Sequence, residues 1–365
     1  MMKQDGSVWA TGWNGYGQLG DGSTTSKVNF EQVISSGVAA VATGSRYSMI
    51  LKANGSVWST GDNKFGQLGD GSTSTRLTFV EVIAGGIKAV AARYFHSMVL
   101  DQNGAVWATG QNTDGQLGDG SSDDRNAFVQ VISNGVTAIA VGLGHSIVLK
   151  QDGSVWTTGR NNYGQLGAGS TGDTTTFAEV ITGGVKSVAA GFRYSMVVKA
   201  DGSLWATGQN NYGQLGDGST TDQSSFVEIL SSGVQAVAAN TEHTMILKED
   251  GSAWATGLNS QGQLGDGSTT SATNFLQVVS SGVASVAVGS RYSTIIMLDG
   301  TVWATGSNFR GQLGDGYTES KRTFFMVARI YDAPVTGNIS SITMFHDPCF
   351  ISPFLIRGIW RHTAY

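Results

Sequence analysis

Few residues in this chain could fix a fold through covalent bonds or strong charge. The 365 residues include a single cysteine, Cys349, which excludes an internal disulfide. Proline occurs three times and glycine 52 times, so we expect the turns to be glycine turns. Only 13% of the residues are charged, the formal net charge is −5, and no basic block could follow a phosphate backbone. The composition therefore argues against nucleic-acid binding by charge.

Long hydrophobic segments are also missing from the sequence. No apolar run is long enough to span a bilayer, so we expect no membrane insertion. No signal peptide is visible either, because residues 1–5 lead directly into a repeated pattern. We expect a soluble monomer. The sequence leaves its compartment unknown, with cytoplasm or nucleus slightly favoured.

What the sequence does contain is a repeat of 49 residues. The tetrapeptide Gly-Gln-Leu-Gly occurs seven times, with no insertion or deletion between the copies. Each copy has a tryptophan ten residues before its leucine and a phenylalanine eleven residues after it. A fixed period of this length, built from short β-type segments, is the signature of a propeller or a solenoid.

Each period contains four short segments with strand character and no convincing helix. We name them A (38–42), B (47–51), C (7–12) and D (around Phe30 and Val33) after their first copies. An Asp-Gly or Asn-Gly pair separates B from C, which predicts a tight hairpin of type I′. The repeated leucines are expected to be structural plugs between neighbouring units: Leu19, Leu68, Leu117, Leu166, Leu215, Leu264 and Leu313.

We predict an all-β fold, a seven-bladed β-propeller of four-stranded blades. Residues 1–327 would form the seven repeats, and residues 328–365 a divergent C-terminal segment. The chain starts at the end of a B strand, so this segment would supply strands A and B of the first blade. The N- and C-terminal strands would then close the ring in one blade. Residues 360–364 fit strand B, and strand A could come from residues 353–359 or from 339–343; a poorly ordered segment is the third possibility.

The order of motifs resembles the regulator of chromosome condensation (RCC1) repeat family. The resemblance covers about residues 1–327 and rests on the in-frame Gly-Gln-Leu-Gly copies and on the Asp-Gly-x-Val-Trp-Ala-x-Gly segments. It implies a seven-bladed propeller but no single function, because the family includes a nucleotide-exchange factor, a photoreceptor, ubiquitin-ligase modules and an enzyme inhibitor. Two departures stand out. The proline that the family commonly has before strand D is missing, and Ala168 replaces the aspartate that follows Gly-Gln-Leu-Gly in the other copies.

No motif for catalysis, a cofactor or a metal emerges from the sequence. Residues 15–20 match G-x-G-x-x-G, but a dinucleotide site also needs a following helix, and the other six copies lack the first glycine. His96, His145 and His243 share a repeat position with tyrosines, which favours a hydrogen-bonding core role over metal binding. We predict a protein that is not an enzyme, with no catalytic, cofactor-binding or metal-binding residues.

The repeats differ most in one set of loops. Alternating strand directions place the A–B and C–D loops on one face, and the nearly uniform B–C and D–A turns on the other. The variable loops carry aromatic residues and arginines, the side chains of protein-binding hot spots. Neutral drift is the alternative, but it would favour small polar residues at exposed positions. The predicted partner-binding face consists of Trp13, Tyr16, Arg46, Phe65, Tyr94, Phe95, Arg160, Tyr163, Phe192, Arg193, Tyr212, Arg291, Phe309 and Arg310.

We predict from this face a non-catalytic interaction scaffold that binds a protein partner of unknown identity. One alternative is a guanine-nucleotide exchange factor for a small GTPase, which would need a wedge insertion and an acidic site that the uniform repeats lack. Another is a secreted enzyme inhibitor of the β-lactamase-inhibitor kind, which a secretion signal would favour.

Overall fold

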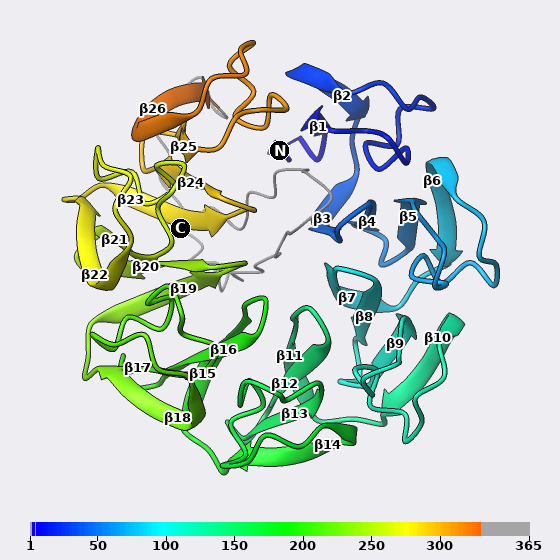
Figure 1. Ribbon diagram of the computed structural model, residues 1–365. Helices are drawn as coiled ribbons and strands as arrows, with labels where there is room; N and C mark the ends of the chain where they lie inside the picture. Colours follow the sequence, from blue (N-terminus) through cyan, green and yellow to red (C-terminus); the bar gives the residue numbers. More distant parts are fainter. Residues whose placement is uncertain (1, 4, 330–365) are drawn as a thin grey trace, which may run out of the picture.

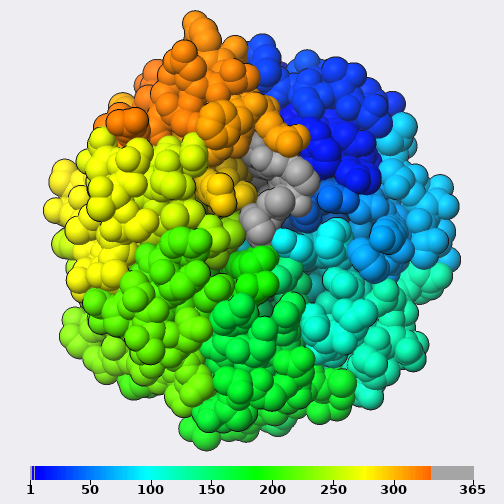
Figure 2. Space-filling model, viewed as in Figure 1, coloured from blue at the N-terminus to red at the C-terminus, as the bar shows by residue number. Residues whose placement is uncertain are grey.

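The computed structural model describes residues 2–3 and 5–329, and their strands are arranged in a ring (Figure 1). They form six four-stranded antiparallel sheets, which we call blades I to VI, and one two-stranded sheet. Consecutive strands of each blade are hydrogen-bonded neighbours, in the order A, B, C, D. Each blade lies against its neighbours around the ring in the space-filling view (Figure 2). No helix that could cross a membrane occurs among the described residues.

The strand bounds repeat closely from blade to blade. The two-stranded sheet consists of β1 (Val8–Gly12) and β2 (Lys27–Ile34). Blade I contains β3 (Val38–Thr43), β4 (Tyr47–Lys52), β5 (Val57–Gly61) and β6 (Arg76–Ile83). Blade II contains β7 (Ile87–Arg93), β8 (His96–Asp101), β9 (Val106–Gly110) and β10 (Arg125–Ile132). Blade III contains β11 (Val136–Val141), β12 (His145–Lys150), β13 (Val155–Gly159) and β14 (Thr174–Ile181).

The second half of the ring continues this pattern. Blade IV contains β15 (Val185–Ala190), β16 (Tyr194–Lys199), β17 (Leu204–Gly208) and β18 (Gln223–Leu230). Blade V contains β19 (Val234–Ala239), β20 (His243–Lys248), β21 (Ala253–Gly257) and β22 (Ala272–Val279). Blade VI contains β23 (Val283–Val288), β24 (Tyr292–Met297), β25 (Thr301–Gly306) and β26 (Lys321–Arg329).

The prediction of seven four-stranded blades is wrong, because the described residues form six. A count of Gly-Gln-Leu-Gly copies counts C–D strand pairs, and the first copy supplies only the pair β1–β2. The described residues before β1 are too few for two further strands. The predicted closure of the ring by strands from 339–343 or 353–364 lies outside the described residues.

The two-stranded sheet stands between blades VI and I and packs against both of them (Figure 1). Thr11 Oγ1 donates a hydrogen bond to the Gly311 carbonyl of blade VI at 3.1 Å. Thr60 of blade I makes the equivalent bond to the Gly17 carbonyl at 3.0 Å. The first copy thus supplies the inter-blade contacts of strands C and D and their loop, whereas neighbouring complete blades also contact each other through strands A and B.

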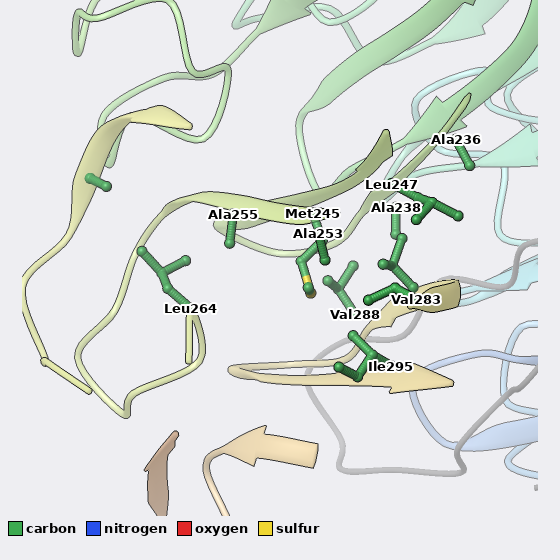
Figure 3. Close-up of a cluster of buried hydrophobic side chains, with 12 residues drawn as sticks. Ala236, Ala238, Met245, Leu247, Ala253, Ala255, Leu264, Val283, Val288 and Ile295 are labelled. Carbon is green, nitrogen blue, oxygen red and sulfur yellow. The ribbon is translucent and has the colours of Figure 1, made fainter. Parts of the chain in front are cut away.

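Hydrophobic clusters between neighbouring blades form the core. In the cluster drawn in Figure 3, Leu264 of the β21–β22 loop and Met245 of β20 share buried space with side chains of blade VI, including Val283 and Ile295. The seven repeated leucines are at most 1% exposed. Alanines on the inner strands, such as Ala236 and Ala238, leave room for the neighbouring blade.

The B–C hairpin turns differ from the predicted type I′. In blade I, Gly55 N donates to the Lys52 carbonyl and Lys52 N donates to the Ser56 carbonyl, both at 2.9 Å. Gly55 has a positive φ, whereas Asn54 is not among the non-glycine residues with positive φ. A type I turn followed by one left-handed glycine has this geometry. The Asn54 side chain instead accepts a hydrogen bond from Ser56 N at 3.0 Å, which holds the turn.

Candidate partner-binding face

A buried polar framework supports each C–D loop. In the first copy, Asn14 Oδ1 accepts a hydrogen bond from Leu19 N at 2.9 Å, and its Nδ2 donates to Asp21 at 3.0 Å. Gln18 Oε1 accepts a bond from Tyr16 N at 3.0 Å. Equivalent asparagine and glutamine bonds to the loop recur in the other six copies. The loop backbone is thus fixed by uniform residues, which leaves the variable side chains free to face outward.

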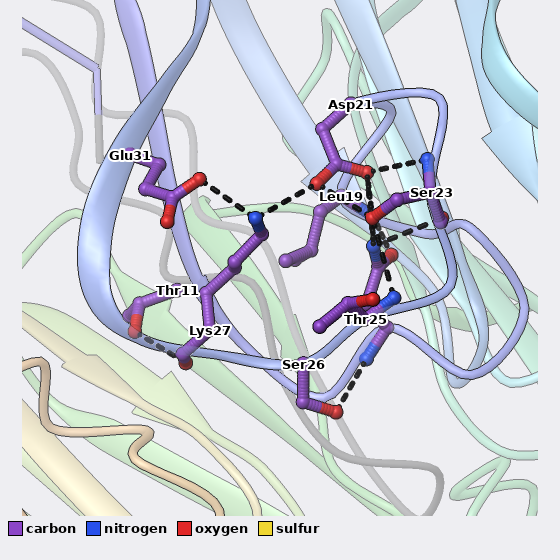
Figure 4. Close-up of polar contacts among 9 residues, drawn as sticks. Thr11, Leu19, Asp21, Ser23, Thr25, Ser26, Lys27 and Glu31 are labelled. Carbon is purple, nitrogen blue, oxygen red and sulfur yellow. Dashed lines mark hydrogen bonds and ion pairs between the residues drawn. The ribbon is translucent and has the colours of Figure 1, made fainter.

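Ionic contacts at the outer end of this loop are shown in Figure 4. Asp21 lies 3.5 Å from Lys27, and Lys27 lies 2.9 Å from Glu31. Partial burial opposes ionisation of Asp21, but the bonds from Ser23 and Asn14 and the charge of Lys27 outweigh it and lower its pKa. In the fourth copy Ala168 removes this carboxylate, and the Asn161 amide keeps its bond to the Ser170 carbonyl and donates to the Gly172 carbonyl instead of to an aspartate.

A second buried framework links the start of strand B in one blade to the next blade. The Tyr47 hydroxyl contacts Ser97 Oγ at 2.8 Å, and Ser97 Oγ donates to the Gln67 carbonyl at 2.8 Å. His96 and His145 reach the equivalent serines of their next blades, Ser146 and Ser195, at 3.0 and 3.1 Å. Each serine also bonds a Gly-Gln-Leu-Gly carbonyl, so the blades and loops are joined in sequence around this part of the ring.

The three histidines of this framework are held in the neutral form. Burial lowers the pKa of His96, His145 and His243 to about 3, and the positive charge of Arg93 adds to the effect at His96 and His145. His243 lies in a third blade and bonds Ser293 at 2.9 Å. Because the histidines lie in different blades and each is hydrogen-bonded to a serine, they cannot bind one metal ion together. No group of metal-ligating side chains occurs in the described part of the chain.

The predicted face residues all lie in A–B or C–D loops and are at least partly exposed. Four of them form a cluster where the two-stranded sheet meets blades I and VI. Arg46 Nη1 donates to the Tyr16 hydroxyl at 2.9 Å and its guanidinium stacks on the Tyr16 ring. Trp13 packs edge-on against Tyr16, with ring centroids 5.4 Å apart, and Arg310 lies over the Trp13 ring at 5.2 Å. Residues from three separate loops thus meet at one point.

A longer cluster extends across blades I to IV. Phe65 packs against Phe95 at 5.0 Å, Phe95 against Tyr94 at 5.3 Å, and Tyr94 against Phe192 at 5.5 Å. Tyr94 belongs to blade II and Phe192 to blade IV, so this contact joins two blades that are not consecutive in the ring. Arg193 then stacks on Phe192 and on Tyr163, each at 4.8 Å, and donates to the Tyr163 hydroxyl at 3.1 Å.

The other four predicted residues lie outside these clusters. Arg160 donates to Asn162 at 3.1 Å, and Arg291 lies 4.0 Å from Glu242. Phe309 is 66% exposed, and Tyr212 is partly exposed in the β17–β18 loop. The structure therefore brings ten of the predicted residues into two clusters and leaves Arg160, Tyr212, Arg291 and Phe309 apart.

Sequence reasoning missed Arg93, which lies buried at the centre of the ring. Its Nη1 donates to the Ala190 carbonyl of blade IV at 2.6 Å, and its Nη2 donates to Asn240 of blade V. Burial lowers its pKa to about 10, so the guanidinium stays charged at neutral pH. The available signal was a departure from the repeat, because four of the other five blades have glycine at this position.

The charge of this surface differs in sign from that of the whole chain. We define the loop face as the A–B loops (44–46, 93–95, 142–144, 191–193, 240–242, 289–291) and the first four residues of each C–D loop (13–16, 62–65, 111–114, 160–163, 209–212, 258–261, 307–310). These segments carry seven basic and three acidic side chains, a formal charge of +4, whereas the chain carries −5. Arg93 and Asp62 among them are buried and cancel each other, so the exposed charge is also +4. Burial raises the pKa of Glu242 and of Asp114, so two of the three carboxyls ionise less readily than usual.

A groove of about 530 Å³ lies elsewhere, at the rim between blades III and IV. Its lining includes Glu179 of blade III and Lys199 and Trp205 of blade IV. None of the loop-face residues lines this groove.

Comparisons with known proteins agree with this architecture. Two family models, both described as the regulator of chromosome condensation (RCC1) repeat, match the chain. One matches residues 38–67, 87–116, 136–165, 185–214, 234–263 and 283–312. The other matches residues 5–51, 103–149, 152–198 and 201–247, which is more than half of the chain. No curated protein sequence matches the chain significantly.

Solved structures with the same fold share little sequence with this chain. The human WBSCR16 structure has a TM-score of 0.82 at 20% identity, over 95% of this chain and 98% of that one. Yeast RCC1 (Prp20) bound to Kap60 has a TM-score of 0.79 at 19% identity, over 98% and 91% of the two chains. Prp20p from Saccharomyces cerevisiae, described with its binding properties to Gsp1p and histones, gives 0.79 and 19% over 98% and 94%. At such identities these likenesses show the fold alone.

Proposed function

The chain belongs to the regulator of chromosome condensation (RCC1) repeat family, and on that premise we propose that it is a non-catalytic scaffold that binds a protein partner through its loop face. The partner would present an acidic surface. Within the family, the fold serves more than one function, so the proposal rests on the loop face of this chain rather than on membership.

The carrying observation is the combination of stacked rings and guanidinium groups on a surface of opposite charge to the chain. Arg46 and Arg193 each stack on a tyrosine and use one donor on its hydroxyl. A guanidinium held in this way loses less side-chain entropy on binding and keeps further donors for a carboxylate. Aromatic residues and arginine are also the residue types in which interface hot spots are enriched.

The outer part of the same loops argues for an acidic protein rather than a nucleic acid. Aspartates follow Gly-Gln-Leu-Gly in six of the seven copies, in the outer part of the C–D loops: Asp21, Asp70, Asp119, Asp217, Asp266 and Asp315. Asp21, Asp70 and Asp119 are ion-paired with Lys27, Arg76 and Arg125, whereas the other three have no ion pair among the described residues. A phosphate backbone that crossed the face would meet these three unpaired carboxylates, whereas a compact acidic protein segment could dock at the centre alone.

Two of the similar structures provide support of a weaker kind. Yeast Prp20 was solved bound to Kap60, and it was described with its binding to Gsp1p and histones. These partners belong to Prp20. They indicate only that a propeller of this fold can act by binding other proteins.

The proposal is tested by affinity capture from the native source, followed by identification of the retained proteins. The loop-face variant combines Arg160→Glu, Arg291→Glu and Tyr212→Ala, three exposed or partly exposed positions outside the stacked clusters. Gln151→Glu with Ser36→Glu, both exposed on the turn face, is the control for added negative charge. We expect the loop-face variant to lose a partner that the wild type and the control retain, with no change in melting temperature.

Two outcomes would contradict the proposal. Equal capture by the loop-face variant and the control would place recognition elsewhere. Accelerated nucleotide release from a small GTPase, measured with the purified protein, would favour the exchange-factor alternative over a non-catalytic scaffold.

A further inference from the structure

The strand C tryptophan of most repeats has two polar partners on the rim of the ring. A lysine from the end of strand B, or from residue 3 in the first copy, lies over the indole of Trp9, Trp58, Trp156, Trp205 and Trp254, at 3.7–4.2 Å from the ring centroid. The indole Nε1 donates to a serine or threonine hydroxyl two residues earlier, at 2.8–3.1 Å, in every copy but one. The tryptophan face is therefore a cation-binding surface that the chain itself occupies five times.

Trp107 of blade II lacks both partners. Asp101 stands where the equivalent blades have lysine, and Ala105 stands where they have serine. Among the described residues no ammonium lies over the Trp107 ring and no side chain accepts from its Nε1. Trp303 also lacks the lysine, but Met297 replaces it and Thr301 still accepts the indole hydrogen bond at 2.8 Å.

Asp101 lies at the end of β8, one strand away from this uncovered indole. Its Oδ1 accepts hydrogen bonds from Asn103 N at 2.8 Å and from Ala105 N at 2.9 Å, which orient the carboxylate on the B–C turn. The exchange of lysine for aspartate thus removes a positive charge and leaves a fixed negative one. Trp107 itself is partly exposed, so solutes can reach it.

Repeat equivalence relates this indole to the groove described above, where one lining residue, Ala168, corresponds to Asp70 between blades I and II. Between blades III and IV, Trp205 and Lys199 line a groove of about 530 Å³ together with Glu179. The same repeat positions between blades I and II are Trp107, Asp101 and Glu81. Glu81 is exposed, and its strand β6 packs next to Trp107 through Val82 and Ile83. An indole face with two carboxylates on one rim is the complement of an organic cation.

We propose that Trp107, Asp101 and Glu81 form a binding site for an organic ammonium group. The ammonium would take the place over the indole that lysine takes in five other copies, and the carboxylates would balance its charge. Such a group could be the side chain of a lysine in another protein or a methylated amine, which share the same cation–π and ionic interactions. This site lies on the rim and does not depend on the loop face.

The test uses the full chain labelled with 5-fluorotryptophan, whose nine tryptophans give separate fluorine resonances that single Trp→Phe variants assign. Tetramethylammonium chloride and lysine amide are titrated separately against sodium chloride at equal ionic strength. We expect a saturable shift of the Trp107 resonance, with Trp156 and Trp205 unmoved. A response to both probes indicates a general ammonium site, and a response to tetramethylammonium alone indicates a site for methylated amines.

Two substitutions make the test specific. Asp101→Lys installs the lysine that five copies have, so it should fold and should weaken the Trp107 response by about two- to fivefold, the ratio expected for loss of one cation–π contact at an exposed site. Lys150→Asp with Ser154→Ala and Gln130→Glu transfers the arrangement to blade III and should make Trp156 respond. The proposal is overturned if Trp107 shifts no more than the lysine-covered tryptophans, or if Asp101→Lys leaves its response intact.

Discussion

The same loops carry two regions with opposite properties: a uniform interior and a variable surface. The asparagine, glutamine and leucine of each C–D loop are buried, hydrogen-bonded and identical in all seven copies. A few residues away, the partner-face side chains are exposed, differ between copies and contact one another across blades. The difference indicates that the buried residues of each loop contribute stability, whereas the exposed residues of the same loop are available for recognition.

Of these two regions, we expect the interior to be the one that acid destabilises, because it contains three buried neutral histidines. The pKa of His96, His145 and His243 is about 3 in the folded chain and about 6.5 when unfolded, so the unfolded state binds more protons between these values. Their contribution to stability is complete above pH 6.5 and is lost as the pH falls towards 3. At pH 5 we expect a loss of about 2 kcal/mol for each histidine. Urea denaturation between pH 7 and 5 measures it.

His145→Tyr is the matched variant for this acid effect. Tyrosine occupies the same repeat position in three blades, and Gly142 leaves the ring room as Gly44 does beside Tyr47. The variant should stay folded and should bind one proton fewer on unfolding at pH 5. An unchanged dependence of stability on pH would mean that this histidine is already charged in the fold.

Removal of a leucine plug should have the next largest effect. Leu117→Ala leaves a cavity in the cluster between blades II and III and should cost about 2–5 kcal/mol, the usual range for a buried leucine. Chemical denaturation measures the change. Leu77→Ala, at a position that is 40% exposed on β6, is the control and should cost far less. Equal costs would show that the uniform interior is not where the stability resides.

On the variable surface, the expected effect is on binding and not on stability. Tyr212→Ala should weaken partner capture while changing the free energy of unfolding by less than about 0.5 kcal/mol, as is usual for surface positions. Tyr163→Ala removes the stacking and hydrogen-bond partner of Arg193 as well, so it should weaken capture more. Thermal melts and capture are compared for both variants. A large drop in melting temperature for Tyr212→Ala would place this tyrosine with the interior.

The lysine–tryptophan stacks of the rim should give the smallest change. Lys150→Met removes the ammonium that lies 3.7 Å from the Trp156 ring centroid but keeps most of the aliphatic stem. We expect a cost of about 0.5–1 kcal/mol, as for cation–π pairs at exposed sites, measured by urea denaturation. A cost near that of Leu117→Ala would indicate that the rim contributes to the core.

The sequence by itself determined the repeating unit of this protein, because strand period, glycine turns and buried leucines are local properties that recur every 49 residues. It also placed the variable side chains in the loops. Two local inferences failed. Seven motif copies did not mean seven four-stranded blades among the described residues, and the Asp-Gly and Asn-Gly hairpins use a type I turn with one left-handed glycine.

Only the tertiary structure decided which of those side chains meet. Closure of the ring brings Tyr94 of blade II against Phe192 of blade IV and carries the Arg93 guanidinium to carbonyls about a hundred residues away in sequence. It also sets the Trp107 indole at an inter-blade contact, beside Val82 and Ile83 of blade I. These contacts depend on the number and tilt of all blades at once, so no window of sequence contains them, whereas each hairpin is fixed within its own few residues.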